Sequence, residues 1–360
     1  MEFFSCRTKI YMGSGSLQSL KELVKGKLLV VCDPFFMENG KAKEIASLSG
    51  ATEVAYFADI KPDPDVTLAA KGAALVQAFT PDAVVAIGGG STLDCAKAML
   101  YFSGVDATLI AVPTTSGSGS EVTDFAILTH DGVKHPLVDE KLLPKAAILD
   151  ASLLTALPRS LIADGGFDAI SHALEALVAT NGGAITDALA TDSFCGVYNH
   201  LGQSFAGNTG VRQTIHNASC MAGLAFSQAG LGLCHAASHA LGGMFHIPHG
   251  RLNAILLPAV ISLNASVAGA KYAALSRNAG LGGAVENMGV RNLKNALIRL
   301  RREVKLPGTL ADAGVSPAKL RESREKIVTA ILADPCCETN PVKVDKALVV
   351  RLLNEVAGSG

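Results

Sequence analysis

The 360-residue sequence has few charged side chains and no tryptophan. Asp, Glu, Lys and Arg make up 18% of the residues, and 31 basic against 32 acidic groups leave a net charge of −1. A protein that binds nucleic acid needs a basic surface to neutralise phosphates, so this balance excludes nucleic acid as an expected partner. Aromatic residues account for only 5%, so composition does not predict the size of a substrate pocket. The 49% hydrophobic content is ample for ordinary cores, and the length predicts two domains.

Three further patterns are absent. The eight cysteines form no CxxC pair, which favours reduced, mostly buried thiols over a disulfide framework. The N-terminal residues contain no basic segment followed by an apolar one, so no secretory signal is apparent and we expect a cytoplasmic protein. The motif GxGxxG does not occur, so the usual dinucleotide-binding fingerprint is missing.

The longest stretch without a charged residue covers 38 positions, between Arg212 and Arg251. Polar side chains, six glycines and five histidines interrupt every window of about 20 apolar residues that a membrane-spanning helix needs. We therefore expect no membrane segment. The stretch is predicted to form the buried interior of a helical domain, and its histidines need an explanation.

The first part of the chain predicts an α/β domain. Three continuous apolar runs, 28–32, 83–87 and 108–112, are typical of strands that are buried on both faces of a parallel sheet. Residues 66–79 carry apolar side chains at helical spacing, which gives a βαβ pattern. We predict a doubly wound, Rossmann-like dinucleotide-binding domain over residues 1–152.

After residue 152 the sequence changes to long segments that are rich in Ala and Leu, with few β-branched runs. Six segments are predicted to be helices: 162–178, 184–197, 212–226, 252–274, 292–304 and 317–332. Residues 153–360 are therefore predicted to form an all-α domain. Because no long linker separates the two domains, we expect a cleft between them, where small ligands commonly bind.

A glycine-rich turn, Gly88-Gly89-Gly90-Ser91, directly follows the predicted strand 83–87. Glycines let the backbone approach a phosphate, and the N–H groups at the start of the following helix favour an anion. A tight turn with no ligand explains the same residues, so the loop alone leaves both interpretations open.

A second loop, residues 113–121, follows the predicted strand 108–112 and is dense in hydroxyls and glycines. Its side chains can hydrogen-bond a phosphate, a ribose or a carboxamide, and two such loops are harder to explain as bare turns. Asp33 stands at the end of the strand 28–32, where a carboxylate can accept both ribose hydroxyls and repels a 2′-phosphate. Asp33 therefore favours NAD over NADP, although a simple turn cap is an alternative role.

Histidines and one aspartate recur at helical spacing. Asp168 and His172 stand four residues apart, so both project from one helix face and suit one metal ion, although such pairs also occur by chance. His235 and His239 repeat the spacing, and His249 follows. A single buried histidine is usually a core residue, but a cluster in a charge-free segment has few partners except one another or a metal. One carboxylate with three neutral imidazoles suits Fe(II) or Zn(II).

Four segments together resemble the iron-dependent (group III) alcohol dehydrogenases, over nearly the whole chain. They are residues 88–97, 113–123, 167–176 and 235–258. Two shorter segments, 225–233 and 134–137, are most similar to the branch of 1-propanol dehydrogenases from propanediol utilisation. The resemblance implies a dehydroquinate synthase-like fold, in which an α/β domain precedes an all-α domain.

The resemblance also implies an activity and a metal site. The activity is reversible hydride transfer between NAD(H) and a short-chain primary alcohol or aldehyde, with Fe2+, or alternatively Zn2+, at the metal site. The implied metal ligands are Asp168, His172, His235 and His249. His239 is implied to face the substrate and is a candidate for relaying a proton to solvent. We expect His246 to line the cavity or to support a ligand.

Cofactor contacts are implied at the two loops and at nearby strand ends. These positions are Asp33, Gly89, Gly90, Ser91, Asp94, Lys97, Thr114, Thr115, Ser118, Ile127, Lys134 and Leu153. The resemblance places Asp33 on the adenosine ribose, residues 89–91 on the pyrophosphate, and the second loop near the nicotinamide. Asp63 stands where many members of the family have Asn, which puts a cofactor contact there in doubt.

Two alternatives to this function stay open. One is a glycerol-type polyol dehydrogenase of the same superfamily, and the other is a non-catalytic scaffold that keeps the fold. The four-ligand set favours the iron-type branch, and competent residues at every site position favour catalysis. We expect a homo-oligomer, in the cytoplasm or inside a bacterial microcompartment, where shell or enzyme partners would dock on its folded surface.

Overall fold

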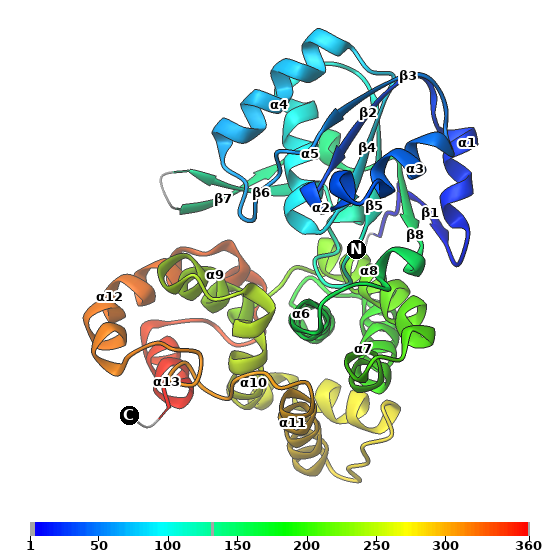
Figure 1. Cartoon of the computed structure of the whole chain (residues 1–360). Coiled ribbons are helices and arrows are strands. Elements are labelled where there is room, and N and C mark those ends of the chain that lie inside the picture. Colours follow the sequence, from blue (N-terminus) through cyan, green and yellow to red (C-terminus); the bar gives the residue numbers. More distant parts are fainter. Residues whose placement is uncertain (1–3, 131–132, 359–360) are drawn as a thin grey trace. The chain divides into compact units, whose positions relative to one another are not determined.

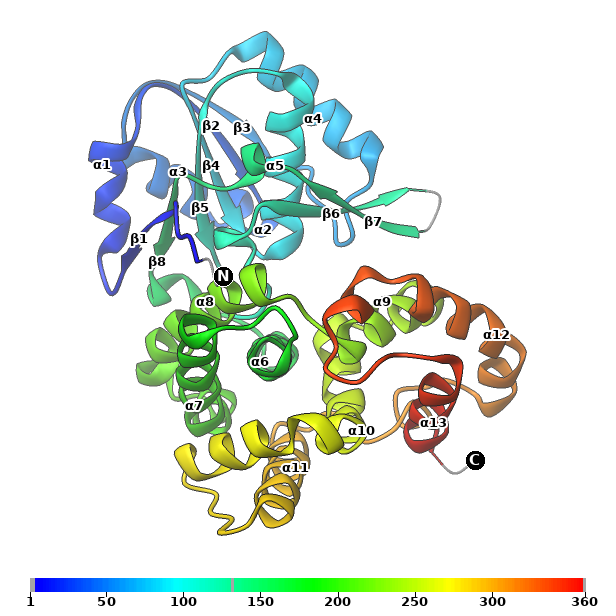
Figure 2. The same cartoon turned by 180° about the vertical axis from the view of Figure 1, so that it is seen from behind.

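The computed structural model describes residues 4–130 and 133–358, and it divides into two compact units (Figures 1 and 2). We call Ser5–Leu157 the sheet unit, and the residues from Pro158 onward, together with Phe4, the helical unit. The division falls slightly beyond residue 152, the predicted boundary. The reason is that Leu153 and Leu154, in the 3-10 helix η4 (Ala151–Leu154), are buried in the core of the sheet unit.

The sheet unit is built on one parallel sheet with helices on both faces. Its strands, in spatial order, are β1 (Lys9–Met12), β8 (Ala146–Leu149), β5 (Thr108–Pro113), β4 (Ala83–Gly88), β2 (Lys25–Cys32) and β3 (Gly50–Phe57). The helices are α1 (Leu20–Leu23), α2 (Pro34–Glu38), α3 (Lys41–Ser47), α4 (Val66–Phe79) and α5 (Gly90–Ser103). An antiparallel hairpin, β6 (Phe125–His130) with β7 (Val133–Val138), projects from the unit (Figure 1).

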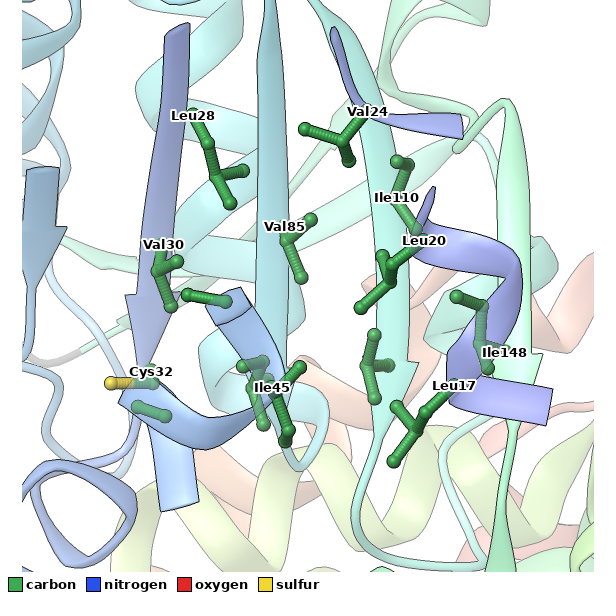
Figure 3. Close-up of a cluster of buried hydrophobic side chains, with 14 of the residues drawn as sticks. Leu17, Leu20, Val24, Leu28, Val30, Cys32, Ile45, Val85, Ile110 and Ile148 are labelled. Atoms are coloured by element: carbon green, nitrogen blue, oxygen red, sulfur yellow. The ribbon is translucent and has the colours of Figure 1, made fainter. Parts of the chain in front are cut away.

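The continuous apolar runs are explained by burial of both faces of the sheet. Leu28 and Val30 of β2 point to the face covered by α1 and α3, where they pack with Val85 and Ile110 (Figure 3). Leu29 and Val31 point to the opposite face, which α4 and α5 cover. Since neighbouring side chains on a strand alternate between faces, each position must be apolar. The structure thus confirms the predicted doubly wound α/β fold.

The order of the strands reverses at β2, and this reversal positions a ligand site. From β2 the chain continues to β3 on one side, and then crosses to β4 on the other side of β2. In doubly wound sheets a crevice opens at such a reversal, outside the carboxyl ends of the strands. Here those ends are Asp33, after β2, and the glycine turn after β4.

The helical unit is all-α, as predicted. Its helices are α6 (Arg159–Val178), α7 (Ala184–Ala206), α8 (Arg212–Ala229), α9 (Leu233–Phe245), α10 (His249–Asn278), α11 (Glu286–Glu303), α12 (Pro317–Ala333) and α13 (Lys346–Val356). Six of them match predicted segments, whereas α9 and α13 were not predicted. Two glycines stand just before α9 and two more lie within it; because glycine disfavours helix interiors, they obscured the helical pattern.

Burial explains both the apolar stretch and the cysteines. Among the described residues, α10 is the one helix long and apolar enough to cross a membrane by length and composition. However, 78% of its most apolar window is buried within the protein, as in the core helix of a folded domain. All eight cysteines are free thiols, and four of them are buried, so the predicted burial applies to half of them.

Candidate metal and cofactor sites

Three helices of the helical unit bring the four predicted metal ligands together. Asp168 and His172 lie one turn apart on α6, His235 lies in the first turn of α9, and His249 begins α10. Oδ1 of Asp168 lies 3.5 Å from Nε2 of His249 and 3.8 Å from Nε2 of His235. It lies 3.9 Å from Nε2 of His172. We call these four residues the Asp168 cluster.

The spacing and bonding of the Asp168 cluster fit a bound divalent cation. Nitrogen and oxygen ligands lie about 2.0–2.2 Å from a zinc ion, so two ligands of one ion are at most roughly 4.4 Å apart. All three Asp168–histidine distances are shorter than this limit. In addition, Nε2 of His235 is buried and has no hydrogen-bond partner among the described residues. A buried nitrogen without a partner is costly unless something else, such as a metal, binds it.

Outer residues hold two of the ligands in place. Nδ1 of His235 donates to Oε2 of Glu175 at 2.6 Å, which leaves Nε2 with a lone pair that faces the cluster. Nδ2 of Asn253 donates to Oδ1 of Asp168 at 2.9 Å, and Ser238 in turn hydrogen-bonds Asn253. Such partners orient metal ligands and raise their basicity.

Glu175 and Asn340 also bind the four N–H groups at the start of α9, residues 232–235. Glu175 accepts those of residues 232, 234 and 235 at 3.0, 2.6 and 3.3 Å. Asn340 accepts that of residue 233 at 3.1 Å. The first N–H groups of a helix have no partner within the helix. Two buried side chains from distant segments therefore fix the end of α9 that carries His235.

The pKa shifts of the Asp168 cluster show which kind of charge the cluster favours. Burial alone raises the pKa of Asp168, but the neighbouring histidines outweigh it and hold that pKa far below its usual range. Burial lowers the pKa of His235, yet the nearby carboxylate of Asp168 and the hydrogen bond with Glu175 raise it to about 9. Burial keeps the pKa of His249 well below its usual range. The buried carboxylates thus favour positive charge among the three imidazoles, which a bound cation would supply.

Replacement of Glu175 by Gln is expected to weaken metal binding. The amide keeps the volume of the side chain, but it removes the negative charge and turns one acceptor into a donor beside the N–H groups of α9. We expect metal affinity, measured by competition with a chelator, to fall roughly 10–100-fold. The exposed Glu303 provides the matched control, Glu303→Gln, which should leave the affinity unchanged. Wild-type affinity in Glu175→Gln would contradict this role.

His239 adjoins the Asp168 cluster and also reaches solvent. Its ring stacks on that of His249, with 5.2 Å between centroids, and its side chain is 31% exposed. Its Nδ1 lies 2.8 Å from Oδ2 of Asp334, a residue that the sequence had not indicated.

His246, in contrast, is exposed and ends α9 in the left-handed conformation. Whether His246 lines the cavity or supports a ligand stays a prediction.

The two predicted phosphate-binding loops contact one another at the carboxyl edge of the sheet. β4 ends at Gly88, and α5 begins at Gly90 with Gly89 as its N-cap. A Cβ atom on Gly89 would lie 3.2 Å from the hydroxyl of Thr115, and one on Gly90 would lie 3.0 Å from that of Ser118. The close approach leaves little room for larger residues. Ser91 follows on α5, and Thr114 donates its N–H to the carbonyl of Gly88.

Asp94, Lys97 and Ile127 are joined by hydrogen bonds within the protein. Asp94 accepts from the hydroxyl of Ser120 at 2.5 Å and from the N–H of Ile127 at 3.0 Å. Lys97 is only 1% exposed and donates to both oxygens of Thr123 and to the carbonyl of Phe125. These bonds tie α5 to the segment that leads into β6. Direct contact of Asp94 or Lys97 with a cofactor stays a prediction.

The remaining predicted cofactor residues have varied surroundings. Asp33 caps α2, since its Oδ1 accepts the N–H of Phe35 at 2.9 Å, so the turn-cap role is real. The carboxylate keeps further acceptor sites on both oxygens, so its contact with a cofactor ribose stays a prediction. Lys134 forms a 2.6 Å ion pair with Asp63. Leu153 is buried in the hydrophobic core of the sheet unit, and its contact with a cofactor stays a prediction.

Sequence reasoning did not identify Glu175, Asn253, Asp334 and Asn340. A signal existed for Glu175, because it lies seven residues after Asp168 and three after His172, on the same helix face. An acidic residue on such an apolar face suggests a buried partner. No local signal existed for Asp334 and Asn340, because each bonds a segment about a hundred residues earlier, at separations of 95 and 107.

A parallel sheet with glycine-rich loops at its strand reversal, together with an Asp–histidine cluster in a helical unit, defines a metal-dependent oxidoreductase. The chain belongs to the iron-containing alcohol dehydrogenase family. The model "Iron-containing alcohol dehydrogenase" matches residues 7–151, and "Fe-containing alcohol dehydrogenase family, C-terminal" matches residues 162–357. The sequence resemblance to this family is thereby confirmed.

Individual relatives show the same relationship over the full length. The chain is 39% identical to 1-propanol dehydrogenase PduQ of Citrobacter freundii, covering 99% of this chain and 100% of that protein. It is 34% identical to the NADPH-dependent butanol dehydrogenase of Clostridium saccharobutylicum, covering 95% of each. A solved structure of sulfoacetaldehyde reductase from Bifidobacterium kashiwanohense in complex with NAD+ has a TM-score of 0.91 at 25% identity and covers 100% of both chains.

Proposed function

We propose that this protein is an NAD(H)-linked, metal-dependent alcohol dehydrogenase that interconverts short-chain aldehydes and primary alcohols. The expected pairs are propanal with 1-propanol and acetaldehyde with ethanol. The proposal rests above all on the Asp168 cluster, in which a buried histidine nitrogen without a hydrogen-bond partner faces a carboxylate and two further imidazoles. The similarity to a 1-propanol dehydrogenase supports the three-carbon substrate.

The Asp168 cluster would hold the metal. A divalent cation bound there would supply Lewis-acid chemistry, which stabilises negative charge on the substrate oxygen. Fe2+ is the metal we expect, and Zn2+ suits the same nitrogen and oxygen donors. Glu175 and Asn253 keep His235 and Asp168 in the orientation that this role requires.

His239 is proposed to exchange the substrate's proton with solvent. Its Nδ1 is engaged with Asp334, so Nε2 is the nitrogen that accepts or releases the proton. Partial exposure of the ring gives that proton a path to water. The two loops of the sheet unit would anchor the cofactor, with its pyrophosphate at Gly89, Gly90 and Ser91. Positioning of both reactants would then supply much of the rate.

The proposal is tested by NADH oxidation with aldehydes of two to four carbons, under aerobic and anaerobic conditions, with added Fe2+ or Zn2+. We expect aldehyde-dependent NADH oxidation that needs one of the two metals and is fastest near three carbons. Faster turnover of glycerol or 1,2-propanediol than of 1-propanol would instead favour the polyol dehydrogenase. Failure of every aldehyde with both metals would contradict the proposal.

Asp33→Gly is expected to relax the preference for NADH over NADPH. The carboxylate would repel a 2′-phosphate, whereas glycine removes that charge and still serves acceptably as an N-cap. We expect the ratio of kcat/KM for NADH to that for NADPH to fall at least about tenfold, or roughly 1.4 kcal/mol. Asp65→Gly removes a comparable cap, on α4, and is the matched control. If both variants keep the wild-type ratio, Asp33 does not contact the ribose.

The predicted assembly and location extend the same proposal. A homo-oligomer, in the cytoplasm or within a bacterial microcompartment, remains what we expect. Measurement of the mass of the purified protein in solution tests the first expectation, and a monomer would contradict it.

A further inference from the structure

A second group of potential metal ligands adjoins the Asp168 cluster and contains a thiol. Its members are His239 of α9, Asp334 at the end of α12, and Cys336 in the 3-10 helix η6 (Pro335–Thr339). The ligand atoms of these three side chains all lie within 4.8 Å of one another. The function proposed above makes no use of Cys336.

We propose that His239, Asp334 and Cys336 form a second cation site, selective for thiophilic divalent ions such as Zn2+, and that its occupation inhibits the enzyme. The inhibitory effect rests on the proposed function, because it requires His239 to handle the substrate's proton. Binding of the ion does not depend on that function.

The distances need little adjustment to fit such an ion. Zinc lies about 2.3 Å from sulfur and about 2.0–2.2 Å from nitrogen or oxygen, so two ligands of one ion are at most roughly 4.5 Å apart. Because the three ligand atoms already lie within 4.8 Å of one another, they need to move by a few tenths of an ångström at most to bind one ion. Nδ1 of His239 and Oδ2 of Asp334 are already 2.8 Å apart.

The environment of the carboxylate supports a cation. Burial raises the pKa of Asp334, but hydrogen bonds from His239 and from the Cys336 backbone outweigh it and lower that pKa below its usual value. The side chain is therefore ionised at neutral pH. Its Oδ1 accepts the N–H of Cys336 at 2.9 Å, which fixes η6 and leaves Oδ2 directed at His239.

The thiol determines which ions the site selects. Burial and the nearby Asp334 raise the pKa of Cys336, so an ion must displace the thiol proton to bind. Zn2+ and Cd2+ bind thiolates strongly enough to do so, whereas Mg2+ prefers oxygen ligands. The partly exposed ring of His239 leaves a small ion a route from solvent.

Occupation of this site would remove His239 from proton transfer. A cation bound to Nδ1 and to Oδ2 of Asp334 would replace the present hydrogen bond and pin the imidazole. The ring also stacks on His249, so a positive charge there would lie next to a ligand of the catalytic metal. Metal in excess of the Asp168 cluster is therefore expected to slow the reaction.

Cadmium titration of the full-length protein tests the site, after the Asp168 cluster has been loaded with one equivalent of Zn2+. Cadmium bound to a thiolate gives an ultraviolet charge-transfer band, and the Asp168 cluster contains no thiol, so the band reports the second site without an activity assay. We expect one further equivalent in the wild type, and one equivalent in Asp168→Asn when Cd2+ is added without prior Zn2+. We expect no band in Cys336→Ser. The control Cys337→Ser should keep it, because that thiol bonds the carbonyl of Ile331 instead.

Inhibition is measured in parallel. Zn2+ beyond the first equivalent should inhibit the wild type, and the inhibition constant should be at least tenfold weaker in Cys336→Ser but unchanged in Cys337→Ser. A band that survives in Cys336→Ser, or a titration that ends at the first equivalent, overturns the site. A band without inhibition overturns the inhibitory role. Absence of aldehyde reduction in every loaded protein would instead count against the proposed function, because the cadmium band is independent of it.

Discussion

Asp168→Asn should abolish tight metal binding and nearly all activity. The amide has the same shape and can still accept the hydrogen bond from Asn253, so the change removes chiefly the negative charge and one metal–oxygen bond. Three histidines would then face the cation without an anionic ligand. We expect less than one tenth of an equivalent of retained metal, and a fall in kcat/KM of roughly 1,000-fold, or about 4 kcal/mol of transition-state stabilisation.

The control removes the same negative charge at a site outside the Asp168 cluster. Asp192 is an exposed aspartate on α7, and Asp192→Asn should retain full metal content and full activity. Circular dichroism and the melting temperature of both variants establish that they are folded. Stoichiometric metal together with wild-type aldehyde reduction in Asp168→Asn would remove Asp168 from the metal site.

Gly250→Ala should disrupt the Asp168 cluster without touching any ligand. Gly250 follows His249 in α10, where the helix passes against the backbone of α6. A Cβ atom there would lie 1.8 Å from the carbonyl oxygen of Asp164 and 2.6 Å from its carbonyl carbon. Because both atoms belong to the backbone, the two helices must separate by on the order of 1 Å, which carries His249 away from Asp168.

The expected result of Gly250→Ala is a loss of stability together with a loss of metal. We expect about 3 kcal/mol of destabilisation, seen as a lower melting temperature, and at least a tenfold weaker metal affinity. Gly243→Ala is the matched control, since a Cβ atom on Gly243 meets nothing within 4 Å. Alanine inside α9 should stabilise the protein by about 0.5–1 kcal/mol. If Gly250→Ala matches Gly243→Ala in both measurements, the close helix contact does not hold the cluster.

The parts of the fold that could be predicted are those with a regular apolar pattern, which is either a continuous apolar run or apolar residues at helical spacing. β2, β4 and β5 read as strands because they are buried on both sides, and α4 matched its predicted bounds of 66–79 because its period is regular. The edge strands β1 and β3 were not predicted. Neither has a continuous buried run, since β1 contains no buried residue and β3 only one, Phe57, and their pairing with β8 and β2 is set by tertiary contacts.

Residue type and spacing were enough to predict the four members of the Asp168 cluster, but not the residues that support them. The i, i+4 pair on α6 and the histidines of a charge-free segment are local signals. Glu175 carries a weaker signal of the same kind, on the same helix face. Asn340 and Asp334 carry none, because a polar residue near the C-terminus looks like any surface residue until the chain folds back on α9. The conformation of His246 likewise depends on how α9 ends.

The capping of α9 has a consequence for how the protein is made. Glu175 lies 57 residues before the helix start at Gly232, and Asn340 lies 107 residues after Leu233. A chain still being synthesised that ends before residue 340 has all four predicted metal ligands but lacks one of the two side chains that cap the helix start carrying His235. His235 is therefore fully supported only after residue 340 has been made and the chain has folded back on α9.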